Sequence, residues 1–139
     1  MKKTFSSQWI GSRQVRKQRK YRYHAPLHLA HKLVSAVLSK ELRKKYQRKS
    51  FPLRKGDLVQ IMRGFFKKKE GKVSHVDLKK KKILIEGMQR TKKDGSKISV
   101  AFDPSNLMIK DLIMEDKKRI QSMEKLKEAH SSQKGKHAS

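Results

Sequence analysis

The chain has 139 residues and carries 38 lysines and arginines against 12 acidic residues, which gives a formal net charge of +26. It contains no cysteine, so disulfide frameworks, cysteine-bearing zinc sites and cysteine nucleophiles are excluded, and no stretch approaches the ~18 apolar residues of a membrane span. Such a charge makes a compact state repel itself and makes a polyanion the natural partner.

The content of large apolar residues decides between a folded and a disordered chain. Leucine, isoleucine, valine and phenylalanine make up 32 of the 139 residues, or about 23%. This fraction lies just above the ~20% below which a highly charged chain is expected to stay unfolded. The sequence therefore predicts one modest domain with basic extensions rather than one large domain.

The charge divides the chain into three parts. Residues 1–50 hold fifteen basic residues and a single acid, Glu41; residues 51–110 hold sixteen and six, and residues 111–139 hold seven and five. The corresponding net charges are +14, +10 and +2. We therefore expect a basic arm, a basic middle of mixed sign and a nearly balanced tail.

The first part, residues 1–24, has neither helical nor strand periodicity, and we expect an extended arm that is disordered until it is bound. Trp9, Tyr21 and Tyr23 are interspersed among its basic residues. Such a segment suits RNA, because guanidinium planes and aromatic rings stack on unpaired bases. Two alternatives stay open: a solvated tail, and a mitochondrial presequence, although the positive charge does not stop where a presequence would end.

A helical extension is expected over residues 25–50. Apolar residues recur every four positions from Leu29 to Val37, which predicts an amphipathic helix over residues 28–46. Ser39 interrupts this run and is expected to cap a second short helix over residues 40–46. The opposite face is basic, so one side can pack on protein while the other meets phosphate.

Three histidines raise the alternative of a zinc site. His24, His28 and His31 have the spacing of one helical face, but Pro26 breaks the register between the first two, and the nearest carboxylate is Glu41. Structural or RNA-contacting histidines are therefore favoured, and neither a metal nor another cofactor is expected.

From residue 51 the apolar period changes to two, which is typical of strands. Five short segments have this character: residues 57–62, 71–77, 83–85, 98–102 and 107–109. Asp94-Gly95 is a strong turn signal between the third and the fourth. The sequence predicts a mainly β fold with a small barrel over residues 51–110, because closure removes edge strands. About 60 residues is near the lower limit for independent stability, so we expect the binding partner to stabilise the fold further.

The last part, residues 111–139, is expected to form a C-terminal helix followed by a disordered tail. Apolar residues repeat every third position from Ile120 to Leu126. Glu115 lies four residues before Arg119, so the two are expected to form an ion pair on the helix surface.

One motif carries a family resemblance. Residues 54–64, followed by Glu70-Gly71-Lys72-Val73, resemble the KOW motif, a strand–loop–strand unit of small SH3-like barrels. Gly56 and Gly64 permit tight turns, and Gly71 permits a close approach to another backbone. The intervening loop presents two phenylalanines beside three lysines, a surface suited to stacking on bases and binding phosphate.

Further segments match in the same order and spacing: residues 24–28, 38–43, 45–46, 85–87, 92–95 and 104–107. Together with the motif they make residues 16–120 similar to the universal KOW-containing protein of the large ribosomal subunit, the L-twenty-four family, called L-twenty-six in eukaryotes. The helical block before the barrel is typical of its archaeal and eukaryotic branch. Lys68 stands where this family commonly has glycine, which indicates a different loop path.

The resemblance implies a structural RNA-binding protein of the large ribosomal subunit. It further implies binding of large-subunit rRNA near its 5′ domain, action early in subunit assembly, and a place near the rim of the peptide exit tunnel. The implied partners are large-subunit rRNA and neighbouring ribosomal proteins, with neither a membrane nor a homo-oligomer. The implied location is cytosolic, and nucleolar during assembly if the source is eukaryotic.

The residues expected to bind RNA are basic or aromatic and lie on the arm, the second helix and the barrel loops: Arg13, Arg16, Lys17, Arg19, Lys20, Arg22, Arg43, Arg54, Lys55, Arg63, Phe65, Phe66, Lys67, Lys68, Lys69, Lys72, Arg90, Lys92, Lys93 and Lys97. The residues expected at structural turns are Gly56, Gly64, Gly71, Gly87, Gly95 and Pro104.

The sequence disfavours two other classes of function. A KOW-type transcription-associated factor would bind nascent transcript, but such factors usually join KOW to another domain, for which this chain has no length. An enzyme is disfavoured, because the spacing from Gly64 to Lys72 is too long for a phosphate-binding loop and Val73 stands where serine or threonine must hold magnesium. No other catalytic motif is present, so no catalytic residue is expected.

Overall fold

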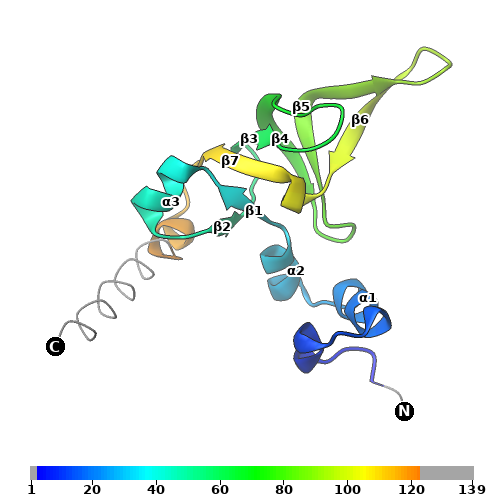
Figure 1. Cartoon of the computed structure of the whole chain (residues 1–139), viewed down its shortest axis with the longest axis vertical. Coiled ribbons are helices and arrows are strands. Elements are labelled where there is room, and N and C mark those ends of the chain that lie inside the picture. The colour runs from blue at the N-terminus through cyan, green and yellow to red at the C-terminus, as the bar shows by residue number, and fades with distance from the viewer. Residues whose placement is uncertain (1–2, 123–139) are drawn as a thin grey trace.

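A computed structural model describes residues 3–122 of the chain. Its seven strands are β1 (Ser35–Leu38), β2 (Ser50–Pro52), β3 (Leu58–Ile61), β4 (Glu70–Asp77), β5 (Lys82–Thr91), β6 (Lys97–Phe102) and β7 (Leu107–Asp111). They form one sheet in the order β2-β1-β7-β3-β4-β5-β6 (Figure 1). All neighbouring pairs are antiparallel except β1 and β7, which are parallel.

The helical segments lie before the first strand, between strands and after the last strand. They are the short 3-10 helix η1 (Ser7–Gly11), α1 (Val15–Tyr23), α2 (Leu27–Leu33), α3 (Lys40–Tyr46) and a second 3-10 turn, η2 (Pro104–Asn106). Residues 117–122 are also helical. In Figure 1, η1, α1 and α2 extend to one end of the molecule, and the β5–β6 hairpin projects at the other end.

One apolar core is formed by buried side chains of the sheet. It takes Leu38 from β1, Val59 from β3, Val73 from β4, Ile83 from β5 and Ile109 from β7, all of which are fully buried. Alternate residues of a strand point to opposite faces, and the strand registers place these five side chains on the same face of the sheet. The mainly β, SH3-like arrangement is thus confirmed, and each of the five expected strands is present.

The helix expected over residues 28–46 is wrong between Leu33 and Ser39. Residues 35–38 form β1, which pairs with β2 through Ala36 and Phe51 and with β7 through Leu38 and Ile109. Burial alternates along β1, with Ala36 and Leu38 inside. Residues four apart share one face of a helix, and they also share one face of a strand, where side chains alternate every two residues. The apolar pattern alone therefore did not distinguish a helix from a strand. The second short helix is confirmed as α3, because the Ser39 side chain accepts a hydrogen bond from the backbone N–H of Leu42.

The prediction that residues 1–24 lack regular structure is also wrong. The Gln18 side chain on α1 donates hydrogen bonds to the carbonyls of Trp9 and Ser12, at 2.9 and 2.8 Å, and so fastens η1 to α1. The ring of Tyr21 is buried and stacks on Phe5, with centroids 5.4 Å apart. These contacts are made by a polar side chain and by two aromatic rings, so the segment can be ordered without the regular apolar spacing on which the prediction relied.

The C-terminal prediction is correct in type but not in extent. Residues 112–116 are irregular and helix begins only at residue 117, while Leu126 and the expected disordered tail lie outside the described residues. The expected ion pair between Glu115 and Arg119 is wrong. Arg119 is buried and pairs with Asp57 instead, at 2.7 Å.

This buried pair fastens the C-terminal segment to the sheet. Both terminal nitrogens of the Arg119 guanidinium donate to the Asp57 carboxylate, at 2.8 and 2.7 Å. Asp57 also accepts hydrogen bonds from the backbone N–H groups of Arg54 and Ile113, so one carboxylate joins three segments. The guanidinium lies over the ring of Phe51, 5.2 Å from its centroid.

Candidate nucleic-acid interface

Every basic residue in the predicted RNA-binding set has an exposed side chain. Among residues 3–122, Arg54 is the member of that set that forms an ion pair, with Asp116. The other basic members have no acidic partner in the described part of the chain. A surface of this kind is not stabilised internally and attracts a polyanion.

Helix α1 presents cations without an opposing acid. Arg16, Lys17, Arg19, Lys20 and Arg22 are all exposed along its nine residues. The helix keeps its shape through Tyr21 and Gln18, which pack and hydrogen-bond on its other side, rather than through ion pairs. A polar helix held from one side leaves its charged side chains free for a ligand.

The two phenylalanines of the loop between β3 and β4 differ in their exposure. Phe65 is 93% exposed, so its ring is available for stacking on a base. Phe66 is half-buried and packs edge-on against Phe102, with centroids 5.8 Å apart. The ammonium group of Lys69 lies 5.3 Å from the centre of the Phe66 ring. Phe66 therefore anchors the loop, and Phe65 is the ring it presents.

The backbone of this loop explains its composition. Gly64 has φ 89°, and Lys68 has φ 71°, the left-handed conformation that favours glycine. Lys68 is held there by a hydrogen bond from its backbone N–H to the carbonyl of Ile61, at 2.8 Å. A Cβ on Gly71 would lie 2.7 Å from the Ile85 side chain on β5, so the close approach of the two strands requires glycine.

The fold brings the loop residues together with a distant arginine. Arg63, Phe65 and Phe66 line one pocket with Arg90 of β5 and Phe102 of β6. Two guanidinium groups beside an exposed ring and an apolar floor suit a phosphate and a neighbouring base.

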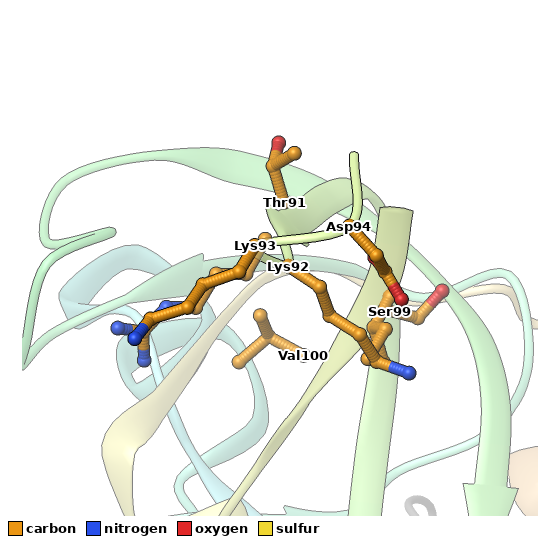
Figure 2. Close-up of a pocket in the computed structure, with 8 residues that line it drawn as sticks. Thr91, Lys92, Lys93, Asp94, Ser99 and Val100 are labelled. Carbon is orange, nitrogen blue, oxygen red and sulfur yellow. The ribbon is translucent and has the colours of Figure 1, made fainter. Parts of the chain in front are cut away.

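The tip of the β5–β6 hairpin forms a second pocket, which Figure 2 shows with Thr91, Lys92, Lys93 and Asp94 above Ser99 and Val100 of β6. Asp94 accepts hydrogen bonds from the hydroxyl and the backbone N–H of Ser96, at 2.6 and 2.9 Å. These bonds hold the pKa of Asp94 below its usual range, so the carboxylate shapes the turn while the lysines remain exposed.

The turn between β4 and β5 was not among the residues expected to bind RNA, although its lysines line a cleft. Its lysines, Lys79, Lys80, Lys81 and Lys82, follow one another, and that run was the signal available. Asp77 accepts a hydrogen bond from the backbone N–H of Lys80, at 2.8 Å, which lowers the pKa of Asp77 and shapes the turn. The turn lies across a cleft from Arg19 and Arg22 of α1.

Other predicted residues lie apart from these groups. The Nε of Arg43 on α3 donates to the carbonyl of Leu38, at 2.8 Å. Arg54 and Lys55 border a groove with His31 and His75. The elements that carry these residues lie apart, with α1 towards one end of the molecule and the β5–β6 hairpin at the other (Figure 1), so the basic residues do not form a single patch.

The histidine cluster does not lie on one helix. His24 is the C-terminal cap of α1, whereas His28 and His31 belong to α2, whose N-cap is Pro26. Within residues 3–122, no three side chains of the metal-ligating types are grouped to hold a metal ion. The same residues contain no helix long and apolar enough to cross a membrane.

The chain is similar to known ribosomal proteins. A family model described as ribosomal proteins L26 of eukaryotes and L24p of archaea matches residues 12–126. The large ribosomal subunit protein uL24 of Methanosphaera stadtmanae is 46% identical over 112 residues, which cover 81% of this chain and 96% of that protein. The matched segment contains α1, the whole sheet and the buried pair of Asp57 and Arg119.

Proposed function

Because the chain belongs to the family of ribosomal proteins L26 of eukaryotes and L24p of archaea, we propose that it binds large-subunit rRNA as a structural constituent of the large ribosomal subunit. The family consists of ribosomal structural proteins and not of enzymes. The observation that carries the RNA-binding part is the exposure of every basic residue in the predicted set, almost all of them without an acidic partner in the described chain.

The proposed mechanism combines charge neutralisation with stacking. Lysines and arginines of α1, the β3–β4 loop and the β5–β6 hairpin contact phosphates, which fixes the position of the protein on the RNA. Phe65 adds stacking on an unpaired base, and Arg63 and Arg90 beside it bind the adjoining phosphates. Because the basic groups lie at both ends of the molecule, one protein contacts separate RNA segments and holds them together.

The wider role follows from the family. The protein is proposed to act early in large-subunit assembly, near the rim of the peptide exit tunnel, beside other ribosomal proteins in the cytosolic ribosome. The assembling subunit would be nucleolar in a eukaryote. A protein that joins distant RNA segments is useful early, because it stabilises an RNA fold before later proteins bind.

Binding of purified large-subunit rRNA tests the proposal. Arg63→Ala and Lys72→Ala each remove an exposed cation of the barrel, and each is expected to weaken binding modestly and to lower the salt slope by about one unit. The matched control is Lys118→Ala, in the nearly balanced C-terminal part. If both barrel variants keep the affinity and the salt slope of the unchanged chain, the barrel is not the RNA-binding surface.

Sedimentation distinguishes the ribosomal role from a transcription-associated one. We expect the protein to travel with large subunits through a sucrose gradient and to remain on them at moderate salt. Large subunits that lack the protein, with the protein instead on RNA polymerase, would contradict the proposal.

A further inference from the structure

A cleft rich in positive charge lies between α1, the β4–β5 turn and η2. Its cationic side chains come from two parts of the chain far apart in sequence: Arg19, Arg22, Lys79, Lys80 and Lys81. The one acid on its walls is Asp103, which already pairs with Lys82 at 2.8 Å. None of the five cations has an acidic partner among the described residues.

One hydrogen bond joins the two walls of this cleft. The Lys81 ammonium group donates to the backbone carbonyl of Arg22, at the carboxyl end of α1, where the helix carries partial negative charge. Burial and the charge of Arg22 lower the pKa of Lys81, which means that the cation is disfavoured by its surroundings. The backbone of Lys81 is also in the left-handed region, with φ 56°, which is an unfavourable conformation for a residue other than glycine.

Helix α1 makes few hydrogen bonds to the sheet. Its stacking and its side-chain hydrogen bonds go to residues before it, through Tyr21 and Gln18. Within residues 3–122, the bond from Lys81 is the only hydrogen bond between α1 and the strands or their turns. Five like charges across the cleft oppose this docking, and an anion between them would reverse the sign of the interaction.

The rim of the cleft adds an aromatic group. Tyr23 is 77% exposed and meets the ring of His24 edge-on, with centroids 4.9 Å apart. The Ser105 side chain, also on the rim, is exposed and supplies a hydroxyl. Cations, a hydroxyl and an open ring together match a nucleotide better than they match an inorganic anion or an acidic peptide.

We propose that this cleft binds a backbone phosphate of RNA, with Tyr23 stacked on the adjoining base, and that the bound nucleotide docks α1 on the sheet. The proposal rests on the RNA binding proposed above and adds a specific site and a conformational consequence. Arginine and lysine donate to the phosphate oxygens from both walls, so the phosphate replaces repulsion by attraction. Without RNA, one hydrogen bond joins α1 to the strands and their turns, and we expect α1 to leave the sheet for part of the time.

The distance between α1 and the sheet can be measured directly in the full chain. The chain has no cysteine, so Val15→Cys on α1 and Glu86→Cys on β5, both exposed, give two unique sites for a fluorescent donor and acceptor. Energy transfer is recorded without ligand and with a 20-nucleotide single-stranded RNA. RNA is expected to narrow and shorten the distribution of distances.

Variants of the cleft identify its cations. Lys80→Gln and Lys81→Asn together remove two charges, and asparagine tolerates the positive φ of Lys81. This pair is expected to abolish the change in distance and to weaken RNA binding about tenfold, with a salt slope lower by about one unit. The matched control is Lys117→Gln with Lys118→Gln, which removes the same charge from exposed positions of the C-terminal helix and should leave the change in distance intact. Equal responses in the two double variants would overturn the proposal.

Two further comparisons test the identity of the ligand. Tyr23→Ala should raise the RNA concentration needed for docking about tenfold, whereas Tyr23→Phe should not change it, since phenylalanine keeps the ring. Tripolyphosphate and poly-glutamate should not dock α1 at concentrations where the RNA does. Docking by either of them as efficient as by RNA, or no effect of Tyr23→Ala, would refute a nucleotide site. If the protein binds rRNA but α1 does not dock on the sheet, this inference alone is refuted. If the protein binds no RNA, the proposed function is refuted as well.

Discussion

The buried pair of Asp57 and Arg119 supports the strongest prediction about stability. Substituting Arg119 by methionine removes the guanidinium but keeps an unbranched side chain over the Phe51 ring. Asp57 then stays fully buried with two backbone N–H donors and no counter-charge. Removing one partner of a buried ion pair typically destabilises a protein by ~3–5 kcal/mol, because the remaining charge is uncompensated.

The size of the effect can be set against the whole domain. About 120 described residues at roughly 0.05–0.15 kcal/mol each give a total stability of ~6–18 kcal/mol. We expect Arg119→Met to remove about 3 kcal/mol, near the lower end of the range, because the Nε of Arg119 is itself buried without a partner in the described structure. A loss of about 3 kcal/mol corresponds to a fall in Tm of about 10 °C for a chain of this size.

Urea unfolding followed by circular dichroism measures the change in free energy. Fluorescence of the single tryptophan, Trp9, is less suitable because it lies in η1 and reports on the N-terminal segment. Lys118→Met is the matched control, since it makes the same type of change at an exposed neighbouring position and should alter the stability by less than ~0.5 kcal/mol.

A double variant separates loss of charge pairing from loss of packing. Asp57→Asn combined with Arg119→Met leaves no uncompensated charge, while asparagine still offers one acceptor oxygen to the backbone N–H groups. It should therefore recover part of the stability lost in Arg119→Met. A loss below ~1 kcal/mol in Arg119→Met with an unchanged m value, or a double variant less stable than both single ones, would refute the reasoning.

Four further predictions concern the loops and strand β4. Lys68→Gly should raise the free energy of unfolding by about 1 kcal/mol in thermal melts, because glycine adopts φ 71° without strain; an unchanged melt would contradict this. Gly71→Ala should destabilise by ~1–3 kcal/mol, because its Cβ would lie 2.7 Å from a side chain on β5. Phe65→Ala should weaken rRNA binding about tenfold and leave the melt unchanged, whereas Phe66→Ala should lower stability by ~1–3 kcal/mol; the reverse result would exchange their roles. The carboxylate of Asp77 has a lowered pKa in the folded chain, so its support of the β4–β5 turn is complete above the ordinary pKa and is lost as the pH falls through the lower, folded value. An NMR titration of its carboxyl carbon should show this low midpoint, and a midpoint at the ordinary value would exclude the hydrogen bond in solution.

The strands after residue 51 were predictable because their signal is local. Alternation places Val59 and Ile61 of β3, and Ile83 and Ile85 of β5, on the buried face, and each strand shows this within a few residues. The tight turn at Asp94-Gly95 is likewise determined by neighbouring residues. Wherever the apolar period and the turn residues agree, the segment has one low-energy form.

The segment before residue 51 was predicted less well because its pattern fits two structures. Val34 and Leu38, four residues apart, can share a helix face or the inner face of a strand. The choice is made by β7, since the backbone of Leu38 is next to Ile109 in a parallel pair. No local signal in residues 34–38 identifies a partner strand that lies about seventy residues later in the chain.

Short-range features of the chain are enough to predict the mainly β class, the five strands after residue 51, the cap at Ser39 and the exposed cations, because charge, alternation and capping depend on residues close together. Long-range packing is needed to explain why Arg119 pairs with Asp57 instead of Glu115, and why Lys81 donates a hydrogen bond to Arg22 across a cleft. Each of these pairs joins residues about sixty positions apart in the sequence, which only the tertiary fold brings together. The net charge of +26 therefore pointed to a polyanion, but the way the chain folds determines which of its cations can bind the same phosphate.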